Sequence, residues 1–260
     1  MRNKTILIIG GTGFVGTILS NILSTYNTVI PIGRTTKVNY EIGQEVSLEL
    51  KKLISSSQLV IFASWDFNIS SDKYIKIHCD SVLQFLKICK DFDTSFLFIS
   101  TALSNKVSRS LYNKAKHMCE ILTIKHGASC MRIGVLVSKL TKSGNIYLKL
   151  SKLPSIYGYK LMLKPDNKKF KLTHIDQLTL FFNSYSVDEV NIFQDTKQSE
   201  TYSLSEILEM FSEKKYKYIY IDWKLIYYIL KTFRFLGINL RINLDSLISI
   251  WGENINEEYL

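Results

Sequence analysis

The chain has 260 residues, of which 46% are hydrophobic and only three are proline, so it can bury a full core and does not have the composition of a disordered chain. Its 33 lysines and arginines outnumber its 23 acidic residues, and the formal net charge of +10 suits an anionic partner. Because no basic run with interleaved aromatic residues stands out, we expect a phosphorylated small molecule rather than a nucleic acid.

The first predicted elements are a strand, a glycine loop and a helix. The apolar run Thr5–Ile9 predicts a buried strand, and apolar residues at helical spacing follow the glycines. A strand that ends in glycines and opens a helix places backbone N–H groups where a pyrophosphate can bind. A tight turn that serves only packing is the alternative. The residues expected to hold a dinucleotide here are Gly10, Gly13, Phe14, Val15 and Gly16.

The second predicted strand, Thr28–Ile32, bears on which dinucleotide is bound. An Asp or Glu after this strand would bind the ribose 2′-hydroxyl of NAD, but the chain instead has Arg34 and Thr35. An arginine beside hydroxyls can pair with a 2′-phosphate through charge-assisted hydrogen bonds. We therefore predict NADP(H), with NAD(H) as the alternative. An ordinary solvated arginine in a turn would have the same sequence.

Strands and helices continue to alternate through the first half. The strand predictions are Leu59–Ala63, Ser95–Ser100 and Cys130–Val137, and the helix predictions are Val46–Ile54, Tyr74–Lys90 and Tyr112–His126. Continuous apolar runs of this kind are typical of strands buried on both faces of a parallel sheet. The fold class is therefore α/β, a Rossmann-type doubly wound parallel sheet over residues 1–138, with the catalytic residues in this domain.

After residue 138 the pattern loosens, and residues 139–260 are expected to form a smaller C-terminal substrate lobe. Prolines, a glycine and five lysines predict an irregular loop over Leu153–Lys171. Thr173 is expected to cap a helix that runs to about Tyr185. A strand near 189–193 is expected to return to the main sheet, and a capping box at Ser203 and Glu206 predicts a helix through Met210.

The aromatic stretch Trp223–Phe235 lies in an apolar segment interrupted by charges, so it does not predict a membrane span. We expect it to pack the lobe or a partner subunit rather than to bind ligand, although its basic side could touch an anionic membrane surface. The short apolar run at the N-terminus is the first strand rather than a signal peptide, so a cytoplasmic location is expected.

Four cysteines, Cys79, Cys89, Cys119 and Cys130, form no CxxC pair and have no histidine at metal-ligand spacing. All four fall in predicted helices or strands. We expect buried, reduced thiols and no metal site.

Tyr112 and Lys116 lie four residues apart and therefore face the same side of a predicted helix. A tyrosine is a poor proton donor or acceptor near neutral pH unless its phenolate is stabilised by about 3–4 kcal/mol. A cation about 4 Å away supplies about 4 kcal/mol at an effective dielectric constant near 20. The spacing thus predicts a catalytic tyrosine whose pKa Lys116 lowers. An exposed Tyr and Lys that coincide by chance are the alternative.

A third group comes from the end of the preceding strand, where a hydroxyl could hold a carbonyl oxygen against the tyrosine. Thr101 is the first choice, Ser100 the second and Ser104 the third. A polar strand end or a helix cap would account equally well for any one of them.

Together these motifs resemble the short-chain dehydrogenase/reductases, specifically the extended type, the NAD-dependent epimerase/dehydratase family. The matching segments are GGTGFVG at 10–16, VIFAS at 60–64, FISTA at 98–102, YNKAK at 112–116, MRIGVLV at 131–137 and FKLTHIDQL at 170–178. They cover most of residues 5–180 in the family's order.

The resemblance implies a nicotinamide cofactor and a Ser/Thr–Tyr–Lys catalytic set. Tyr112 would be the general acid/base, Lys116 would bind the nicotinamide ribose, and Thr101 or Ser100 would hold the reacting oxygen. Ala63 and Ser64 would line the cofactor site. The substrate would be a nucleoside-diphosphate sugar that contacts Thr101, Tyr112 and Lys164, and the enzyme would be a homodimer joined through helices 74–90 and 112–126.

The chain also departs from the family pattern. His78 replaces the usual Asn, which puts the supporting proton relay in doubt, and only ten residues separate Thr101 from Tyr112. Arg132 could support the cofactor site or satisfy a buried carboxylate. A diphosphate could be clamped by the lysines of the irregular segment, although such lysines are more often solvated: Lys160, Lys164, Lys168, Lys169 and Lys171.

Three functions remain open. The first is an NADPH-dependent reductase of a 4-keto-6-deoxy nucleoside-diphosphate sugar, in surface polysaccharide biosynthesis. The second is a nucleotide-sugar epimerase or dehydratase with tightly held NAD(P). The third is a non-catalytic sensor or assembly protein that binds NADP(H).

Overall fold

A computed structural model describes residues 1–69, 72–136, 155–156, 159–164, 169–187, 192–194, 201–210, 216–236 and 244–251. Its body is a six-stranded parallel sheet in the order β10-β5-β4-β3-β1-β2. These strands are β1 (Thr5–Ile9), β2 (Thr28–Ile32), β3 (Leu59–Phe62), β4 (Ser95–Thr101), β5 (Ser129–Ile133) and β10 (Ile192–Gln194). The strand order reverses between β1 and β3, the place where open α/β sheets bind ligands. The predicted doubly wound sheet is confirmed.

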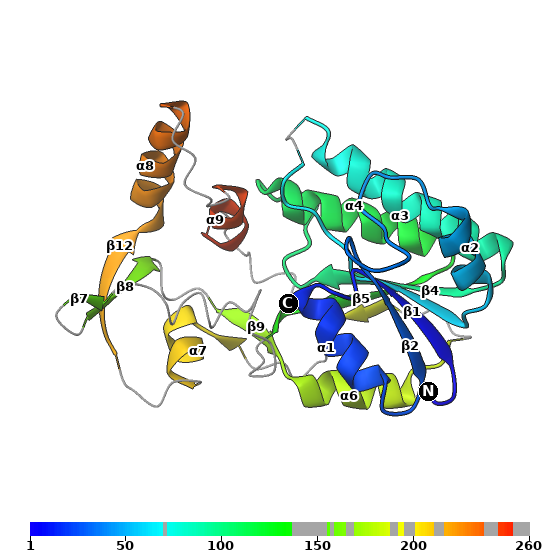
Figure 1. The fold of residues 1–260 in the computed structure, drawn as a ribbon. Helices are drawn as coiled ribbons and strands as arrows, with labels where there is room; N and C mark the ends of the chain where they lie inside the picture. Colours follow the sequence, from blue (N-terminus) through cyan, green and yellow to red (C-terminus); the bar gives the residue numbers. More distant parts are fainter. Residues whose placement is uncertain are drawn as a thin grey trace.

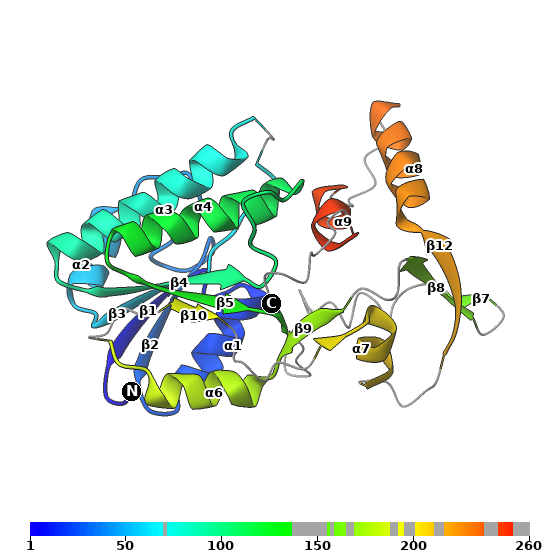
Figure 2. The same cartoon turned by 180° about the vertical axis from the view of Figure 1, so that it is seen from behind.

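Helices cover both faces of this sheet. They are α1 (Phe14–Leu23), α2 (Leu48–Ser55), α3 (Tyr74–Asp91), α4 (Leu111–Lys125) and α6 (Ile175–Ser184). Figures 1 and 2 show α2, α3 and α4 on one face and α1 and α6 on the other.

Alternation along the buried strands builds a core on each face. In β1, Leu7 and Ile9 pack in the cluster that contains Phe85 of α3. Ile6 and Ile8 point the other way, into the cluster that α1 and α6 complete. Because both faces are buried, the central strands consist mainly of continuous apolar runs, and this is the pattern from which they were predicted.

The remaining elements form a smaller, second region (Figure 1). One sheet contains β6 (Val135–Leu136), β9 (Phe170–Thr173) and β11 (Thr201–Tyr202), and another contains β7 (Ser155–Ile156), β8 (Tyr159–Lys164) and β12 (Lys217–Asp222). The helices are α7 (Leu204–Met210), α8 (Trp223–Phe235) and α9 (Leu244–Trp251). No described helix is long and apolar enough to cross a membrane.

The irregular loop predicted for Leu153–Lys171 is wrong over its described part. Residues 159–164 form β8, which pairs in parallel with β12, and β9 begins at Phe170. The lysines suggested a solvated loop, yet Lys160 is buried and its Nζ lies 4.6 Å from the centroid of the Tyr216 ring. The two lysines among the six residues of β8 therefore made this strand resemble a solvated loop in the sequence.

Smaller corrections concern element ends. The strand predicted for Cys130–Val137 is divided at Gly134, where an added Cβ would lie 2.3 Å from the carbonyl oxygen of Lys171. Thr173 ends β9 instead of capping a helix, and its Oγ1 accepts a hydrogen bond from the Gly134 amide at 2.8 Å. The N-cap of α6 is His174. The domain boundary predicted at residue 138 falls on residues outside the described ranges.

The capping box before α7 is confirmed. The Glu206 amide donates to Ser203 Oγ at 3.2 Å, and the Ser203 amide donates to Glu206 Oε2 at 2.6 Å. These reciprocal bonds satisfy two amides that the helix itself cannot pair.

Candidate functional site

The glycine loop after β1 is packed against the ends of two neighbouring strands. The amides of Gly10 and Gly11 both donate to the carbonyl oxygen of Ile32, at 2.8 and 2.9 Å. Gly10 has φ +83°, and a Cβ there would lie 2.6 Å from the Ser64 amide nitrogen. A Cβ on Gly16 would lie 2.1 Å from the Gly10 carbonyl oxygen. Only glycine fits these two positions, because a side chain would force the loop, β3 and α1 apart.

The loop leaves the positive end of α1 open. Gly13 is the N-cap and makes no side-chain capping bond, and the first turn of α1 has no acidic residue. At a helix start the amides of Phe14, Val15 and Gly16 have no intrahelical acceptor. Gly13 and Thr12 are exposed. This loop therefore fits a pyrophosphate, the group for which the sequence predicts it.

Arg34 and Thr35 lie next to this loop, at the carboxyl end of β2. Both are exposed, and Arg34 Nη1 is 3.8 Å from Glu41 Oε1. The preceding Gly33 packs so closely on Thr12 that an added Cβ would lie 2.0 Å from Thr12 Oγ1. The guanidinium is thus beside the glycine loop, and its ion pair among the described residues is long and solvated.

Ala63 and Ser64 follow β3 at the same edge of the sheet. The Ala63 amide donates to the Ile9 carbonyl oxygen at 2.8 Å, and both residues are half-buried. The next residue, Trp65, was not predicted to belong to the site. It could have been found by its place directly after a buried strand.

Tyr112 lies in the first turn of α4 and is half-buried. The Thr101 side chain hydrogen-bonds to its hydroxyl group. The Trp65 ring meets the tyrosine edge-on at 5.5 Å, and the Phe67 ring lies 5.4 Å away. Burial raises the pKa of Tyr112 to about 12, and the bond from Thr101 only partly offsets this.

Lys116 is buried one turn further along α4. Its Nζ donates to the Ile99 carbonyl oxygen at 2.8 Å and lies 4.0 Å from the Trp65 ring and 4.8 Å from the Phe98 ring. Burial lowers the pKa of Lys116 to about 8. The prediction that Lys116 lowers the pKa of Tyr112 is wrong for this arrangement. The reason is that the ammonium group is directed to a carbonyl oxygen and two rings, and desolvation dominates at the tyrosine.

His78 supports Trp65. Its Nδ1 is 2.8 Å from the Tyr74 carbonyl oxygen, which can only accept, and its Nε2 is 3.3 Å from the Asp66 amide, which can only donate. The ring is therefore the neutral Nδ1–H tautomer. Burial lowers the pKa of His78 and favours this form. The indole of Trp65 stacks on the imidazole at 4.0 Å and donates to Tyr74 Oη at 2.7 Å.

Two serine hydroxyls near Thr101 are buried without a hydrogen-bond partner among the described residues. They are Ser100 Oγ and Ser104 Oγ. Leaving a buried hydroxyl unpaired costs free energy, so such groups mark a place where a polar ligand can bind. Both were candidates to hold the reacting oxygen.

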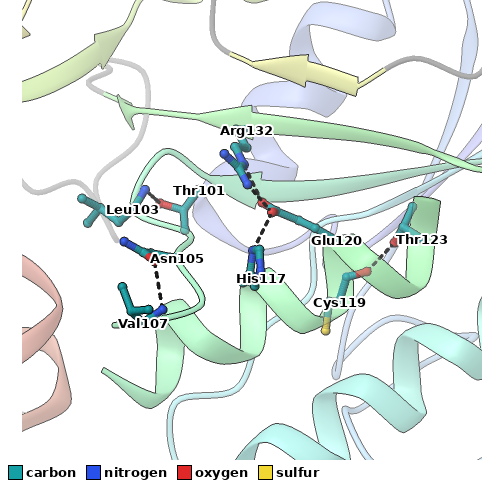
Figure 3. Close-up of polar contacts among 9 residues, drawn as sticks. All are labelled: Thr101, Leu103, Asn105, Val107, His117, Cys119, Glu120, Thr123 and Arg132. Carbon is teal, nitrogen blue, oxygen red and sulfur yellow. Dashed lines mark hydrogen bonds and ion pairs between the residues drawn. The ribbon is translucent and has the colours of Figure 1, made fainter. Parts of the chain in front are cut away.

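Arg132 satisfies a buried carboxylate, which was one of its two predicted roles. Its Nε and Nη2 donate to the two oxygens of Glu120 at 2.9 and 2.6 Å (Figure 3). His117 Nδ1 lies 3.7 Å from the same carboxylate. The bond to Glu120 raises the pKa of Arg132. This pair joins the middle of α4 to β5 behind the site.

Asp245 of α9 holds the N-terminus of α4. Its carboxylate accepts from the amides of Leu111 and Tyr112 at 2.8 and 3.0 Å, and from Ser110 Oγ at 2.8 Å. Ser249 Oγ donates to Asn113 Oδ1 at 3.0 Å in the next turn of α9. This contact was not predicted, because it joins residues more than 130 positions apart and no local pattern indicates it.

Three of the lysines proposed to clamp a diphosphate, Lys160, Lys164 and Lys169, are placed elsewhere in the described part of the second region. Lys164 is exposed at the end of β8, which both views draw apart from α4 (Figures 1 and 2). Lys169 Nζ binds the Glu206 carboxylate at 2.8 and 2.6 Å. Lys160 is buried, as described above, and Lys168 lies outside the described residues.

The overall fold is similar to that of several nucleotide-sugar enzymes. A hypothetical dTDP-4-dehydrorhamnose reductase from Sulfolobus tokodaii matches with TM-score 0.65 and 16% identity over 85% of this chain and 86% of that one. The ADP-L-glycero-D-manno-heptose-6-epimerase of Helicobacter pylori gives 0.64 and 14% over 85% and 86%. The UDP-glucuronic acid 4-epimerase of Bacillus cereus, in complex with UDP-glucuronic acid and NAD, gives 0.62 and 15% over 95% and 97%.

At these identities the likeness establishes the fold alone, and it confirms the predicted resemblance at that level. No protein-family model matches the sequence, and no curated protein matches it.

Proposed function

We propose that the chain is an extended short-chain dehydrogenase/reductase that uses NADPH to reduce a 4-keto-6-deoxy nucleoside-diphosphate sugar. The proposal rests on the observation that two sequence motifs lie at the same edge of the parallel sheet. The glycine loop after β1 and the Thr101–Tyr112 pair after β4 both lie at the carboxyl ends of the central strands. The fold neighbours, which include a reductase and epimerases of nucleotide sugars, support this class of substrate.

The cofactor would be held by groups that the structure shows to be open. The first-turn amides of α1 would bind the pyrophosphate, and Arg34 would bind the 2′-phosphate in place of Glu41. The cofactor, when bound, supplies a hydride. Because the Trp65 ring lies 4.0 Å from Lys116 Nζ, contact between this ammonium and a ribose requires the indole to shift.

The state of Tyr112 favours reduction. With a pKa of about 12 the phenol holds its proton at neutral pH, so in this state it can act as the acid that protonates the alkoxide formed when a ketone is reduced, but not as a base. An epimerase or dehydratase that first oxidises an alcohol needs this tyrosine as a base. Thr101, together with the unpaired hydroxyls of Ser100 and Ser104, would orient the carbonyl oxygen toward the phenol.

The epimerase or dehydratase remains the second candidate, because two of the three compared enzymes are epimerases.

We also propose a homodimer built on α3 and α4. Exposed Met118 and Ile124 on α4 support it, since apolar side chains on the outer face of a helix suit a subunit interface.

Replacing Tyr112 by Phe tests the proposal. The change removes the proton donor and keeps the ring contacts with Trp65 and Phe67, so we expect kcat to fall by about 100-fold or more with the Kd for NADPH unchanged. Tyr26→Phe deletes a hydroxyl at an exposed position and serves as the matched control. Turnover rates and cofactor titrations give both quantities. Full activity in Tyr112→Phe would refute a catalytic role for Tyr112.

A further inference from the structure

The helix α8 was expected to pack the lobe or a partner subunit, but it leaves an apolar face open. Three of its apolar side chains are exposed, at Leu225 (56%), Ile229 (41%) and Phe233 (37%), and so is Leu236 just past its end (64%). Their spacing of four, four and three residues places them on one side of the helix, and we call them the apolar stripe. Figures 1 and 2 show α8 at the far end of the molecule from the parallel sheet.

The other side of α8 is basic and aromatic. Lys224 and Lys231 are exposed and seven residues apart, so they share a face away from the stripe. Tyr228 is exposed among them. The sequence of Trp223–Phe235 has no acidic residue. A helix of this kind, with an apolar stripe, a lysine face and aromatic residues, has the pattern of a helix that lies in a membrane interface.

We propose that α8 binds the surface of a phospholipid bilayer that contains anionic lipids. The stripe would enter the boundary between headgroups and acyl chains, and the lysines would face the negative headgroups. The net charge of +10 attracts the whole molecule to the same surface. A second copy of the chain is a poorer occupant, because packing stripe against stripe would leave the lysine face of each helix without an anionic partner, whereas an anionic bilayer suits both faces.

Sedimentation of the purified full chain with lipid vesicles tests this proposal. We expect binding to vesicles of phosphatidylcholine mixed with phosphatidylglycerol, weaker binding to phosphatidylcholine alone, and release by salt. Leu225→Glu should weaken binding at least about tenfold, because burial of a leucine is worth about that factor or more. The double variant Lys224→Gln/Lys231→Gln should weaken it about 25-fold, since each lysine near an anionic surface contributes roughly fivefold.

Leu180→Glu is the matched control. It makes the same change of charge at an exposed leucine of α6 (69%), so it should keep the affinity of the unaltered chain. Circular dichroism of each variant confirms folding, and Ile229→Glu repeats the test within the stripe.

The proposal is overturned if the chain does not bind anionic vesicles, or if Leu180→Glu loses as much affinity as Leu225→Glu. It is also overturned if Leu225→Glu leaves vesicle binding unchanged. A dimer that Leu225→Glu dissociates with no change in vesicle affinity, measured by light scattering, would assign the stripe to a second copy instead.

Discussion

Lys116 carries an ammonium group in a dry environment with no carboxylate within ion-pair distance among the described residues. A carbonyl oxygen and two aromatic rings replace water around it. These contacts are weaker than hydration, and the pKa therefore falls to about 8. The buried ammonium group of Lys116 therefore destabilises the folded state, by an amount that depends on pH.

The sign of this dependence follows from the direction of the shift. Between pH 8 and about 10.5, the folded state has released the Lys116 proton and the unfolded state still holds it, so this residue's contribution to stability rises with pH by up to about 1.4 kcal/mol per pH unit. Cys89 and Cys130 act in the opposite direction above pH 9, because burial raises the pKa of each to about 12. The effect of Lys116 must therefore be measured as the difference in unfolding free energy between a Lys116 variant and the unaltered chain at each pH.

We expect Lys116→Met to gain stability relative to the unaltered chain at pH 7 and to lose part of that advantage by pH 10. Denaturant unfolding across this range measures the difference. Lys125→Met removes a lysine from an exposed position of the same helix and is the matched control. Parallel pH profiles for Lys116→Met and the unaltered chain would show that the ammonium is not desolvated.

At the residue scale, sequence reasoning finds the groups that a short spacing or a strand end defines. Tyr112 and Lys116 came from their four-residue spacing, and Thr101 from its place after a buried strand. Trp65 was missed although it follows a buried strand, whereas Asp245 was missed because its contact with α4 joins residues far apart in the chain. The direction of the Tyr112 pKa was wrong for a related reason, since desolvation depends on neighbours that the spacing does not reveal.

At the scale of elements, α9 binds the first turn of α4, which carries Tyr112. The Asp245 carboxylate binds two free amides and a hydroxyl at the positive end of α4. A carboxylate in this place stabilises a helix by about 0.5–2 kcal/mol through capping and the helix dipole. It also fixes the backbone of Tyr112 directly, which makes Asp245 a positioning residue.

We expect Asp245→Ala to lower the free energy of unfolding by about 1–2 kcal/mol and to lower kcat with little change in the Kd for NADPH. The kinetic part separates positioning from a purely structural role. Asp222→Ala is the matched control, because the Asp222 carboxylate also accepts a hydrogen bond from an amide at a helix start, that of Lys224 in α8. Equal effects of the two variants on kcat would contradict the role of Asp245 in positioning Tyr112.

The elements of the first half were predicted more completely than those of the second, where α6, α7 and β10 were predicted but the other short strands were not. β1 and β2 have the predicted ends, because glycines or polar residues bound continuous apolar runs. In the second region, strands of only two to six residues carry no comparable signal, and two of the six residues of β8 are lysines. Their pairing partners also lie far along the chain, as β8 and β12 do.

At the scale of the whole molecule, the structure separates three surfaces. The carboxyl edge of the parallel sheet carries the candidate site, α3 and α4 carry the proposed dimer face, and α8 carries the apolar stripe. Membrane binding by α8 and catalysis at Tyr112 rest on different residues. An experiment can therefore refute membrane binding by α8 without refuting catalysis at Tyr112, and the reverse.

The proposed function requires the chain to consume NADPH while it reduces a nucleotide sugar. The most direct test is the ratio of NADPH oxidised to product formed from a 4-keto-6-deoxy nucleoside-diphosphate sugar. We expect one NADPH to be oxidised per alcohol formed, and faster turnover with NADPH than with NADH, because Arg34 has a solvated guanidinium available for the 2′-phosphate. Product that forms while added NADPH stays unoxidised would contradict the reductase and favour the epimerase.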